Sequence, residues 1–117
     1  MRILYVEDNQ ANASLVQRIA KAGNHEFINY VDAETALAEF DSLNPDIVIV
    51  DLRLAGQMDG LELVQHLRNG GYDLPVVVMT AYATDGERDY FLAAGCDEFL
   101  VKPASVNQIV ALLDAIA

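Results

Sequence analysis

The sequence predicts an α/β fold, an open and doubly wound sheet of five parallel strands with helices on both of its faces. Five short apolar runs recur along the 117 residues, and segments with helical periodicity separate them. Three of these runs lack polar alternation, as expected of strands that are buried on both faces of a parallel sheet. Glycine and proline residues punctuate the junctions between the two patterns, which marks the ends of the elements.

The expected strands and helices alternate along the chain. The apolar runs occupy residues 3–6, 27–31, 47–50, 76–79 and 99–101, and the mixed composition of the second run suits an edge strand. Apolar residues spaced three and four positions apart predict helices around residues 15–19, 33–43, 61–67, 90–94 and 109–116, and in the first of these Leu15, Val16 and Ile19 are expected to share one apolar face. Each strand is therefore followed by a helix, and right-handed crossovers place helices on both faces of the sheet.

Two kinds of residue mark the expected ends of helices. We expect left-handed turns after helices at Gly23, Gly70 and Gly95, because glycine enters that conformation without steric cost. Ser105 and Gln108 have the spacing of a capping box at the start of the last helix. No repeat, linker or low-complexity stretch interrupts this order, so residues 1–117 are expected to form one domain.

Composition excludes several classes of protein. The net charge of −11 disfavours binding to nucleic acid, because phosphates would be repelled and no cluster of lysine or arginine relieves the repulsion. No apolar run approaches the length of a membrane span, and the N-terminus does not resemble a secretory signal. The single cysteine fits a reducing compartment, so the cytoplasm is the expected location. The chain ends with its last expected helix, which fits a single-domain protein or a domain excised from a longer one.

A chemically complementary set of polar side chains follows the first, third, fourth and fifth expected strands. Glu7 and Asp8 follow the first strand, Asp51 the third, Thr80 the fourth and Lys102 the fifth. Because open parallel sheets bind ligands at the carboxyl ends of their strands, we expect these side chains to meet at one edge. Each has an ordinary explanation when taken alone, such as a helix N-cap for Asp8 or a solvated ammonium group for Lys102. Four separate coincidences do not explain why the set is chemically complementary.

Three carboxylates in one cleft predict a bound divalent cation. Two carboxylates about 4 Å apart repel each other by roughly 4 kcal/mol at an effective dielectric near 20, and one lysine offsets only part of this. Oxygen ligands without a group of histidines and cysteines favour Mg²⁺ over zinc. A magnesium ion beside a carboxylate, a lysine and a hydroxyl suggests phosphoryl transfer, with Asp51 as the nucleophile that forms an aspartyl phosphate.

The chain resembles the receiver domains of two-component response regulators. The matching stretches are "ILYVEDN", "DIVIVDLRL", "MDGLELV", "VVVMTAY" and "AAGCDEFLVKP", which occur in the order and at the spacing of the family. The resemblance covers essentially the whole chain. It implies a flavodoxin-like sandwich with strand order 2-1-3-4-5, an order for which a member of this family is a standard example.

The resemblance also implies a role for each site residue. Asp51 matches the phosphoacceptor, Thr80 the switch hydroxyl and Lys102 the lysine that binds the phosphoryl group. The implied Mg²⁺ ligands are Asp8, Asp51, Glu7 through water, and the backbone carbonyl of Arg53. Phe99 matches an aromatic switch position, Arg53 and Tyr82 match positions that influence phosphoryl lifetime, and the Lys102–Pro103 bond is implied to be cis.

Two departures from the family pattern concern the switch and the loop after the nucleophile. The loop "LRLAGQMDG" is one residue longer than in many receivers and has Ala55 where they have proline, which would loosen it. Phe99 lacks the hydroxyl of the more common tyrosine, so a switch at this position must work by packing. Neither departure removes a residue of the expected site.

The implied partners are proteins. The phosphodonor is a sensor histidine kinase or a histidine phosphotransfer protein, and a downstream protein is expected to bind the face formed by residues 90–94, 99–101 and 109–116. Phosphorylation and slow autodephosphorylation make the chain a signalling phosphoacceptor rather than an enzyme that turns over a substrate. A monomer or a weak, phosphorylation-dependent dimer is expected.

Three other functions fit the sequence less well. A flavin or nucleotide binder needs a phosphate cradle after the first strand, where this chain has "EDNQANA". A phosphatase with an aspartate nucleophile usually carries an acid two residues later, where this chain has Arg53. A pseudo-receiver that is never phosphorylated is the remaining alternative, and it would not require the complete set of polar residues at the strand ends.

Overall fold

A computed structural model describes residues 1–54, 56–81 and 85–116, and it confirms the predicted architecture. Five parallel strands form one sheet in the order β2-β1-β3-β4-β5, the order that the resemblance implied. The strands are β1 (Arg2–Val6), β2 (Glu26–Tyr30), β3 (Ile47–Asp51), β4 (Val76–Thr80) and β5 (Glu98–Val101). The helices are α1 (Gln10–Ala22), α2 (Ala33–Ala38), α3 (Phe40–Leu43), α4 (Gly60–Asn69), α5 (Asp85–Ala93) and α6 (Val106–Ile116).

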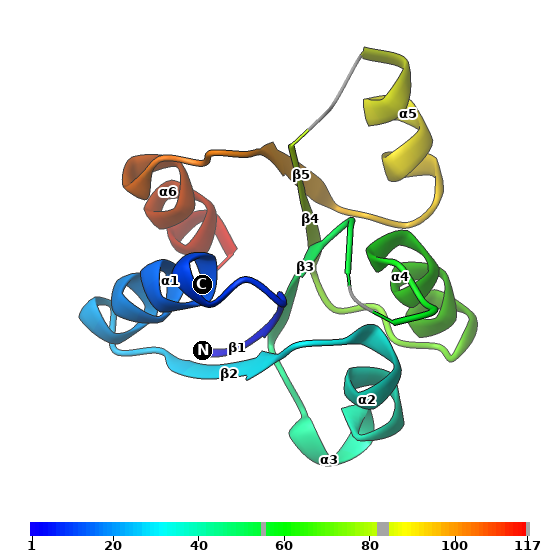
Figure 1. The fold of residues 1–117 in the computed structure, drawn as a ribbon, viewed down its shortest axis with the longest axis horizontal. Helices are drawn as coiled ribbons and strands as arrows, with labels where there is room; N and C mark the ends of the chain where they lie inside the picture. The colour runs from blue at the N-terminus through cyan, green and yellow to red at the C-terminus, as the bar shows by residue number, and fades with distance from the viewer. Residues whose placement is uncertain (55, 82–84, 117) are drawn as a thin grey trace.

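The helices form two layers around the sheet. Helices α1 and α6 lie on one side, and α2, α3, α4 and α5 lie on the other (Figure 1). The mixed run predicted as an edge strand is indeed at one edge of the sheet, as β2, and β5 forms the other edge. The three central strands, β1, β3 and β4, carry the runs that lack polar alternation, because both of their faces are covered.

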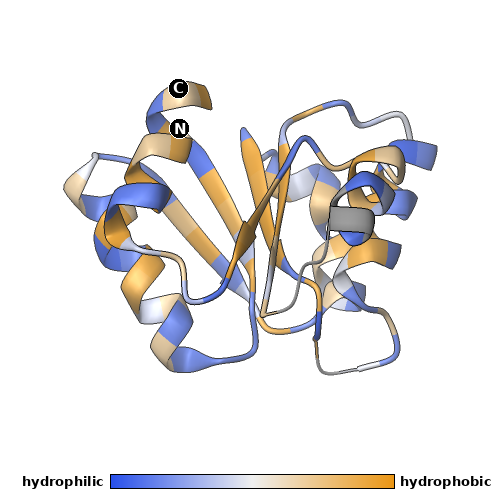
Figure 2. Ribbon diagram, turned by 90° about the horizontal axis from the view of Figure 1, so that it is seen from above, coloured by the Kyte–Doolittle hydropathy of each residue, from blue (hydrophilic) through white to orange (hydrophobic). Residues whose placement is uncertain are grey.

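Successive residues of each central strand enter opposite halves of the core. In β1, Ile3 and Tyr5 pack on the side of α1 and α6, whereas Leu4 and Val6 pack on the side of α2 and α4. The same alternation continues in β3 and β4. Figure 2 shows the largely apolar strands between two layers of helices in which apolar and polar residues alternate.

The buried face of α1 differs from the predicted one. Leu15 was expected to share this face with Val16 and Ile19, but it is exposed, and Ala13 and Ala20 are buried instead. Apolar periodicity alone did not distinguish Leu15 from the two alanines as residues that face the sheet. In the described residues, each helix is too short or too polar to cross a lipid bilayer.

The helix predicted over residues 33–43 is interrupted in the structure. Helix α2 ends at Ala38, Glu39 lies outside the helical conformation at φ −103° and ψ 5°, and α3 starts at Phe40. Phe40 is buried and packs edge-on against Tyr72, with ring centroids 4.6 Å apart. This contact joins positions that are far apart in the sequence, so the periodicity of residues 33–43 did not show the interruption.

The left-handed residues were predicted one position too early in two places. Gly23 and Gly70 have negative φ, and the positive φ occurs at Asn24 (60°) and Gly71 (88°). Gly95 has φ 116°, as predicted. The first two glycines still donate hydrogen bonds to the preceding turn, so each helix continues for one more residue before it turns. The predicted capping box of α6 is present, with the backbone nitrogens and side chains of residues 105 and 108 paired reciprocally.

Candidate functional site

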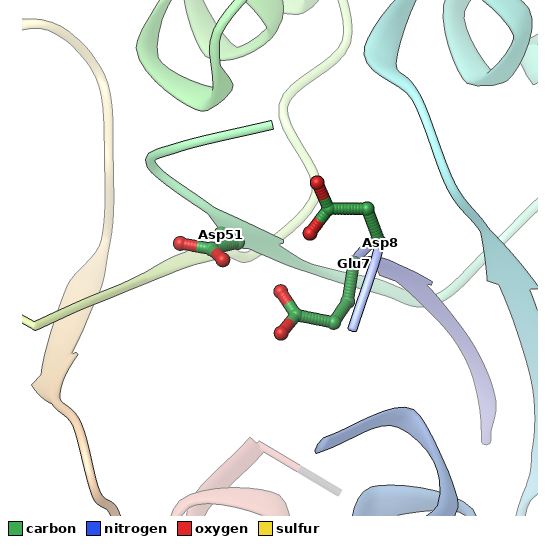
Figure 3. A group of neighbouring side chains, drawn as sticks. All are labelled: Glu7, Asp8 and Asp51. Carbon is green, nitrogen blue, oxygen red and sulfur yellow. The ribbon is translucent and has the colours of Figure 1, made fainter. Parts of the chain in front are cut away.

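The register of the sheet places Glu7, Asp8 and Asp51 next to one another at the carboxyl ends of β1 and β3. Val6 of β1 pairs with Val50 of β3, so the next residues, Glu7 and Asp51, leave the two strands side by side. Figure 3 shows Glu7 and Asp8 leaving the end of β1 and Asp51 leaving the end of β3. One carboxylate oxygen from each of the three residues lies within 4.8 Å of the others. The carboxyl edge of the sheet therefore collects the predicted acids.

Strand alternation decides which side of the sheet each acid faces. Tyr5 and Ile49 both pack on the side of α1 and α6, so Glu7 and Asp51, two residues further along, point to that side. Glu7 is fully buried, Asp51 is 9% exposed, and Asp8 is exposed. Asp8 does not cap α1 as its ordinary explanation required, because the N-cap is Asn9.

Lys102 connects the two buried carboxylates. Its Nζ lies 2.8 Å from Asp51 Oδ2 and 3.0 Å from Glu7 Oε1, although β4 separates β5 from β3. The Lys102 backbone nitrogen donates to the Thr80 carbonyl oxygen at 2.7 Å, which fixes where the side chain starts. One ammonium group thus neutralises part of the charge of two acids from different strands.

Asn12 is a site residue that the sequence analysis missed. Its side-chain amide donates to Glu7 Oε1 at 2.7 Å, from the first turns of α1. The available signal was its spacing, since a polar residue five positions after Glu7 falls on the helix that begins beside the strand end. Asn12 and Lys102 together orient a carboxylate that has no contact with solvent.

The backbone of the loop after β3 also contacts Asp51. The Arg53 backbone nitrogen donates to Asp51 Oδ1 at 3.2 Å. The Leu52 nitrogen donates to the carbonyl of Met79 in β4, and the Gly60 nitrogen donates to the carbonyl of Leu52, each at 3.0 Å. The start and the end of this loop are therefore joined next to the nucleophile expected from the sequence.

The residues of the expected switch are only partly described. Thr80 ends β4 and is 4% exposed, on the edge where the acids gather. Phe99 in β5 is half-buried and meets Phe91 edge-on, with ring centroids 6.3 Å apart. Tyr82, which was expected to influence phosphoryl lifetime, lies outside the described residues. The Lys102–Pro103 bond is cis, as the resemblance implied.

Burial and charge shift the pKa values of this cluster. The pKa of Glu7 is raised from 4.5 to about 7: burial is the largest cause, the neighbouring Asp51 adds to the rise, and the hydrogen bonds from Asn12 and Lys102 counteract part of it. Burial alone would lower the pKa of Lys102, but its hydrogen bonds to Asp51 and Glu7 outweigh this, so its pKa is raised. Near neutral pH, the form of the cluster in which Glu7 is protonated therefore coexists with the form in which Glu7 is ionised and the cluster carries one more negative charge.

The donor set fits a magnesium ion. The three grouped side chains offer only carboxylate oxygens, which suit a hard cation, and the group contains no thiolate or imidazole that would favour zinc. Exposed Asp8 can bring one of these oxygens to an ion from solvent, while the buried residues are already oriented. Glu7, Asp8 and Asp51 are therefore suited to hold the cation that the sequence predicted.

We expect the stability of the metal-free protein to fall as the pH rises from about 4.5 to about 7. The folded protein retains the proton of Glu7 over this range, whereas the unfolded chain has released it, so folding becomes less favourable. The free energy of unfolding should drop by about 2–3 kcal/mol because of this residue. Urea unfolding in EDTA at several pH values measures the change.

The matched control for this prediction is Glu7→Gln, which keeps the shape of the side chain and cannot ionise. The difference in unfolding free energy between the variant and the unmodified protein should change across this pH range and level off above it. Parallel pH profiles for the two proteins would contradict the assignment of the shifted pKa to Glu7.

Comparisons with known proteins agree with this geometry. The family model "Response regulator receiver domain" matches residues 3–114. "Response regulator MprA" of Mycolicibacterium vanbaalenii is 34% identical over 116 residues, which cover 99% of this chain and 50% of that protein. "Two-component response regulator PhoP" of Pseudomonas aeruginosa is 34% identical over 117 residues, covering 99% of this chain and 51% of that protein. The chain thus spans about half the length of the curated relatives it matches.

Solved structures show the same fold. The receiver domain of the Francisella response regulator 1452 superposes with a TM-score of 0.92 at 21% identity, covering 98% of this chain and 94% of that one. The BeF3-activated N-terminal receiver domain of Klebsiella pneumoniae RstA gives a TM-score of 0.90 at 23% identity, covering 98% and 97%. The sheet order, the family match and the curated relatives lead to one conclusion: this chain belongs to the family of response regulator receiver domains.

Proposed function

We propose that this receiver domain, residues 1–117, accepts a phosphoryl group on Asp51 in a two-component or phosphorelay signalling system. The observation that carries the proposal is the position of the Lys102 ammonium group, which lies within hydrogen-bonding distance of both Asp51 and Glu7 at the carboxyl edge of the sheet. A nucleophilic carboxylate, a cation and two further acids in one cluster suit phosphoryl transfer.

Asp51 is the acid best placed to attack. It lies on a central strand, 9% of its surface is accessible, and the Arg53 amide and the Lys102 ammonium group orient its two oxygens. A carboxylate oxygen held in this way can serve as the nucleophile towards phosphorus. Glu7 is fully buried, so its carboxylate cannot meet a donor molecule directly.

Glu7, Asp8, Asp51 and the backbone carbonyl of Arg53 are the groups that we expect to hold Mg²⁺. The bound cation would offset the repulsion between the attacking carboxylate and the oxygens of the incoming phosphoryl group. Lys102 and the Thr80 hydroxyl then bind other oxygens of the same group. Thr80 lies at the end of β4, between the strands that carry Asp51 and Lys102.

The reaction forms one bond and breaks another. An Asp51 oxygen attacks the phosphorus of a phosphohistidine on a sensor kinase or phosphotransfer protein. The phosphorus–nitrogen bond breaks, and the imidazole leaves with the bonding electron pair and takes up a proton. Hydrolysis later reverses the change: water attacks phosphorus, inorganic phosphate leaves, and the Asp51 carboxylate is regenerated. Arg53 and Tyr82 are the positions expected to tune this slow step.

Phosphorylation is proposed to change the surface that binds a downstream protein. The Thr80 hydroxyl would move towards the phosphoryl group, Phe99 would turn further inward, and the face of α5, β5 and α6 would change its partner preference. The phosphoryl group shifts these populations only through its different interaction energy with the two states. We place this exchange in the cytoplasm, with the protein as a monomer or a weak dimer when phosphorylated.

Intact mass after incubation with Mg²⁺ and acetyl phosphate tests the proposal. We expect a gain equal to one phosphoryl group, which peptide mapping assigns to the segment that contains Asp51. The label should be absent when EDTA replaces Mg²⁺, and hydroxylamine should remove it, because an acyl phosphate is labile to that nucleophile.

The other outcomes discriminate between the alternatives. A protein that binds Mg²⁺ but stays unlabelled, even with a competent phosphohistidine donor, would be a pseudo-receiver. Labelling on a serine or threonine that survives hydroxylamine would exclude the proposed chemistry.

A further inference from the structure

Glu34 of α2 contacts the loop that follows β3. It occupies the first turn of α2, whose N-cap is Asp32, and its side chain is half-buried. Its contacts join two segments that the sequence separates by more than twenty residues, and neither family spacing nor helical periodicity singled it out. The contacts lie outside the cluster of acids at the strand ends.

One oxygen of Glu34 accepts two consecutive backbone amides. The Gln57 nitrogen donates to Oε1 at 2.7 Å, and the Met58 nitrogen donates to the same oxygen. The preceding residue, Gly56, has φ 96°, and a Cβ atom built there would lie 2.8 Å from Oε2. The backbone of three successive residues therefore bends around one carboxylate.

This contact holds the far part of the loop that starts at Asp51. Near the sheet, the Gly60 amide donates to the carbonyl of Leu52 at 3.0 Å, which joins the two ends of the loop. Between those ends lies Arg53, whose amide donates to Asp51. A loop held at its base and along its returning half can present the Arg53 carbonyl in one position.

We propose that Glu34 is a positioning residue that holds the β3–α4 loop and thereby sets the affinity of the phosphorylation site for Mg²⁺, an inference that rests on the proposed function. Without the Glu34 carboxylate, the backbone amides of Gln57 and Met58 lose their acceptor within the protein and donate to water instead, so this part of the loop is no longer held against α2. Removal of a residue that orients a metal ligand typically lowers the metal affinity 10–100-fold.

Two substitutions distinguish the effect of the negative charge of Glu34 from the effect of the length of its side chain. Glu34→Gln removes the charge near the N-terminus of α2 but keeps an oxygen that can accept both amides. Glu34→Asp keeps the charge but withdraws the oxygens by one methylene. A residue that acts only through the helix dipole would tolerate Asp and not Gln, whereas a residue that holds the loop should tolerate Gln and not Asp.

The matched control is Glu39→Ala. Glu39 follows the same helix and carries the same charge, but its carboxylate accepts from the Tyr30 hydroxyl rather than from the loop. Glu39→Ala and Glu34→Ala each remove one negative charge, so a difference in Mg²⁺ affinity between these two variants does not come from net charge. Circular dichroism first verifies that each variant folds, and the Gln and Asp variants carry the test if the alanine variant does not.

The first measurement is amide hydrogen exchange by NMR in the absence of Mg²⁺. Exchange at Gln57 and Met58 should accelerate at least about tenfold in Glu34→Ala and Glu34→Asp, and remain near the unmodified rate in Glu34→Gln and Glu39→Ala. Equal exchange at these two amides in all variants would overturn the proposal.

The second measurement is calorimetric titration with Mg²⁺, followed by labelling with acetyl phosphate. We expect the Mg²⁺ dissociation constant to rise by about tenfold in Glu34→Ala relative to Glu39→Ala, and labelling to recover at saturating Mg²⁺. Equal Mg²⁺ affinities in those two variants would refute the role of Glu34. If the exchange and affinity effects occur but the unmodified protein is never labelled, the proposed function fails while the positioning role stands.

Discussion

Asp51→Asn is expected to abolish labelling by acetyl phosphate, with a decrease of at least about 100-fold in the amount of phosphorylated protein. An amide oxygen is neutral and a poor nucleophile, so no acyl phosphate can form at this position. The carboxylate of Glu7 does not replace it, because Glu7 is fully buried and cannot meet a phosphodonor directly. Intact mass spectrometry with Mg²⁺ present measures the loss.

The same substitution has a second consequence that checks its cause. Replacement of Asp51 by a neutral side chain removes one of the influences that raise the pKa of Glu7, so that pKa should fall. Asp114→Asn, an exposed acid on α6, serves as the control and should leave both labelling and the pH profile of stability unchanged. Full labelling of Asp51→Asn would disprove the assignment of the phosphoacceptor.

Gly60→Ala is expected to lower the free energy of unfolding by about 3 kcal/mol or more. A Cβ atom on Gly60 would lie 2.2 Å from the carbonyl oxygen of Asp51 and 3.0 Å from Leu52 Cα. Both neighbours are backbone atoms, so neither can rotate away, and α4 or the end of β3 must move. Urea unfolding followed by circular dichroism measures the loss.

Gly70→Ala is the matched control for this prediction. Gly70 ends α4 with φ −79°, a conformation open to any residue, and its nearest atom to a new Cβ is the His66 carbonyl oxygen at 3.3 Å. We expect its effect on stability to stay within about 1 kcal/mol. If the two alanine variants unfold at the same urea concentration, the close approach of α4 to the end of β3 does not constrain the protein.

The strands and the chemistry at their ends were predictable from the sequence because they depend on local patterns. An apolar run such as 47–50, buried on both faces, has few alternatives to a central strand. The parallel arrangement then requires Glu7, Asp51 and Lys102 to leave the sheet at the same edge. For these elements, pattern and topology agree, and the structure has them where they were expected.

Other features depended on contacts between distant residues. The interruption of the predicted helix at Glu39 accompanies the packing of Phe40 on Tyr72, and α1 packs on the sheet through a face that leaves Leu15 exposed. The left-handed residues expected at Gly23 and Gly70 lie one position later, because the amide of each glycine donates to the preceding helical turn. Local sequence does not contain this information.

The sequence by itself determined the order of strands and helices and the chemical identity of the groups at the strand ends, since burial imposes a periodicity on each element. Only the tertiary structure decided which atoms meet. Lys102 reaches Glu7 across ninety-five positions of sequence, Asn12 orients the same carboxylate, and Glu34 holds the returning half of the loop. Such contacts depend on strand register and helix placement, which the whole core sets jointly and no single segment encodes.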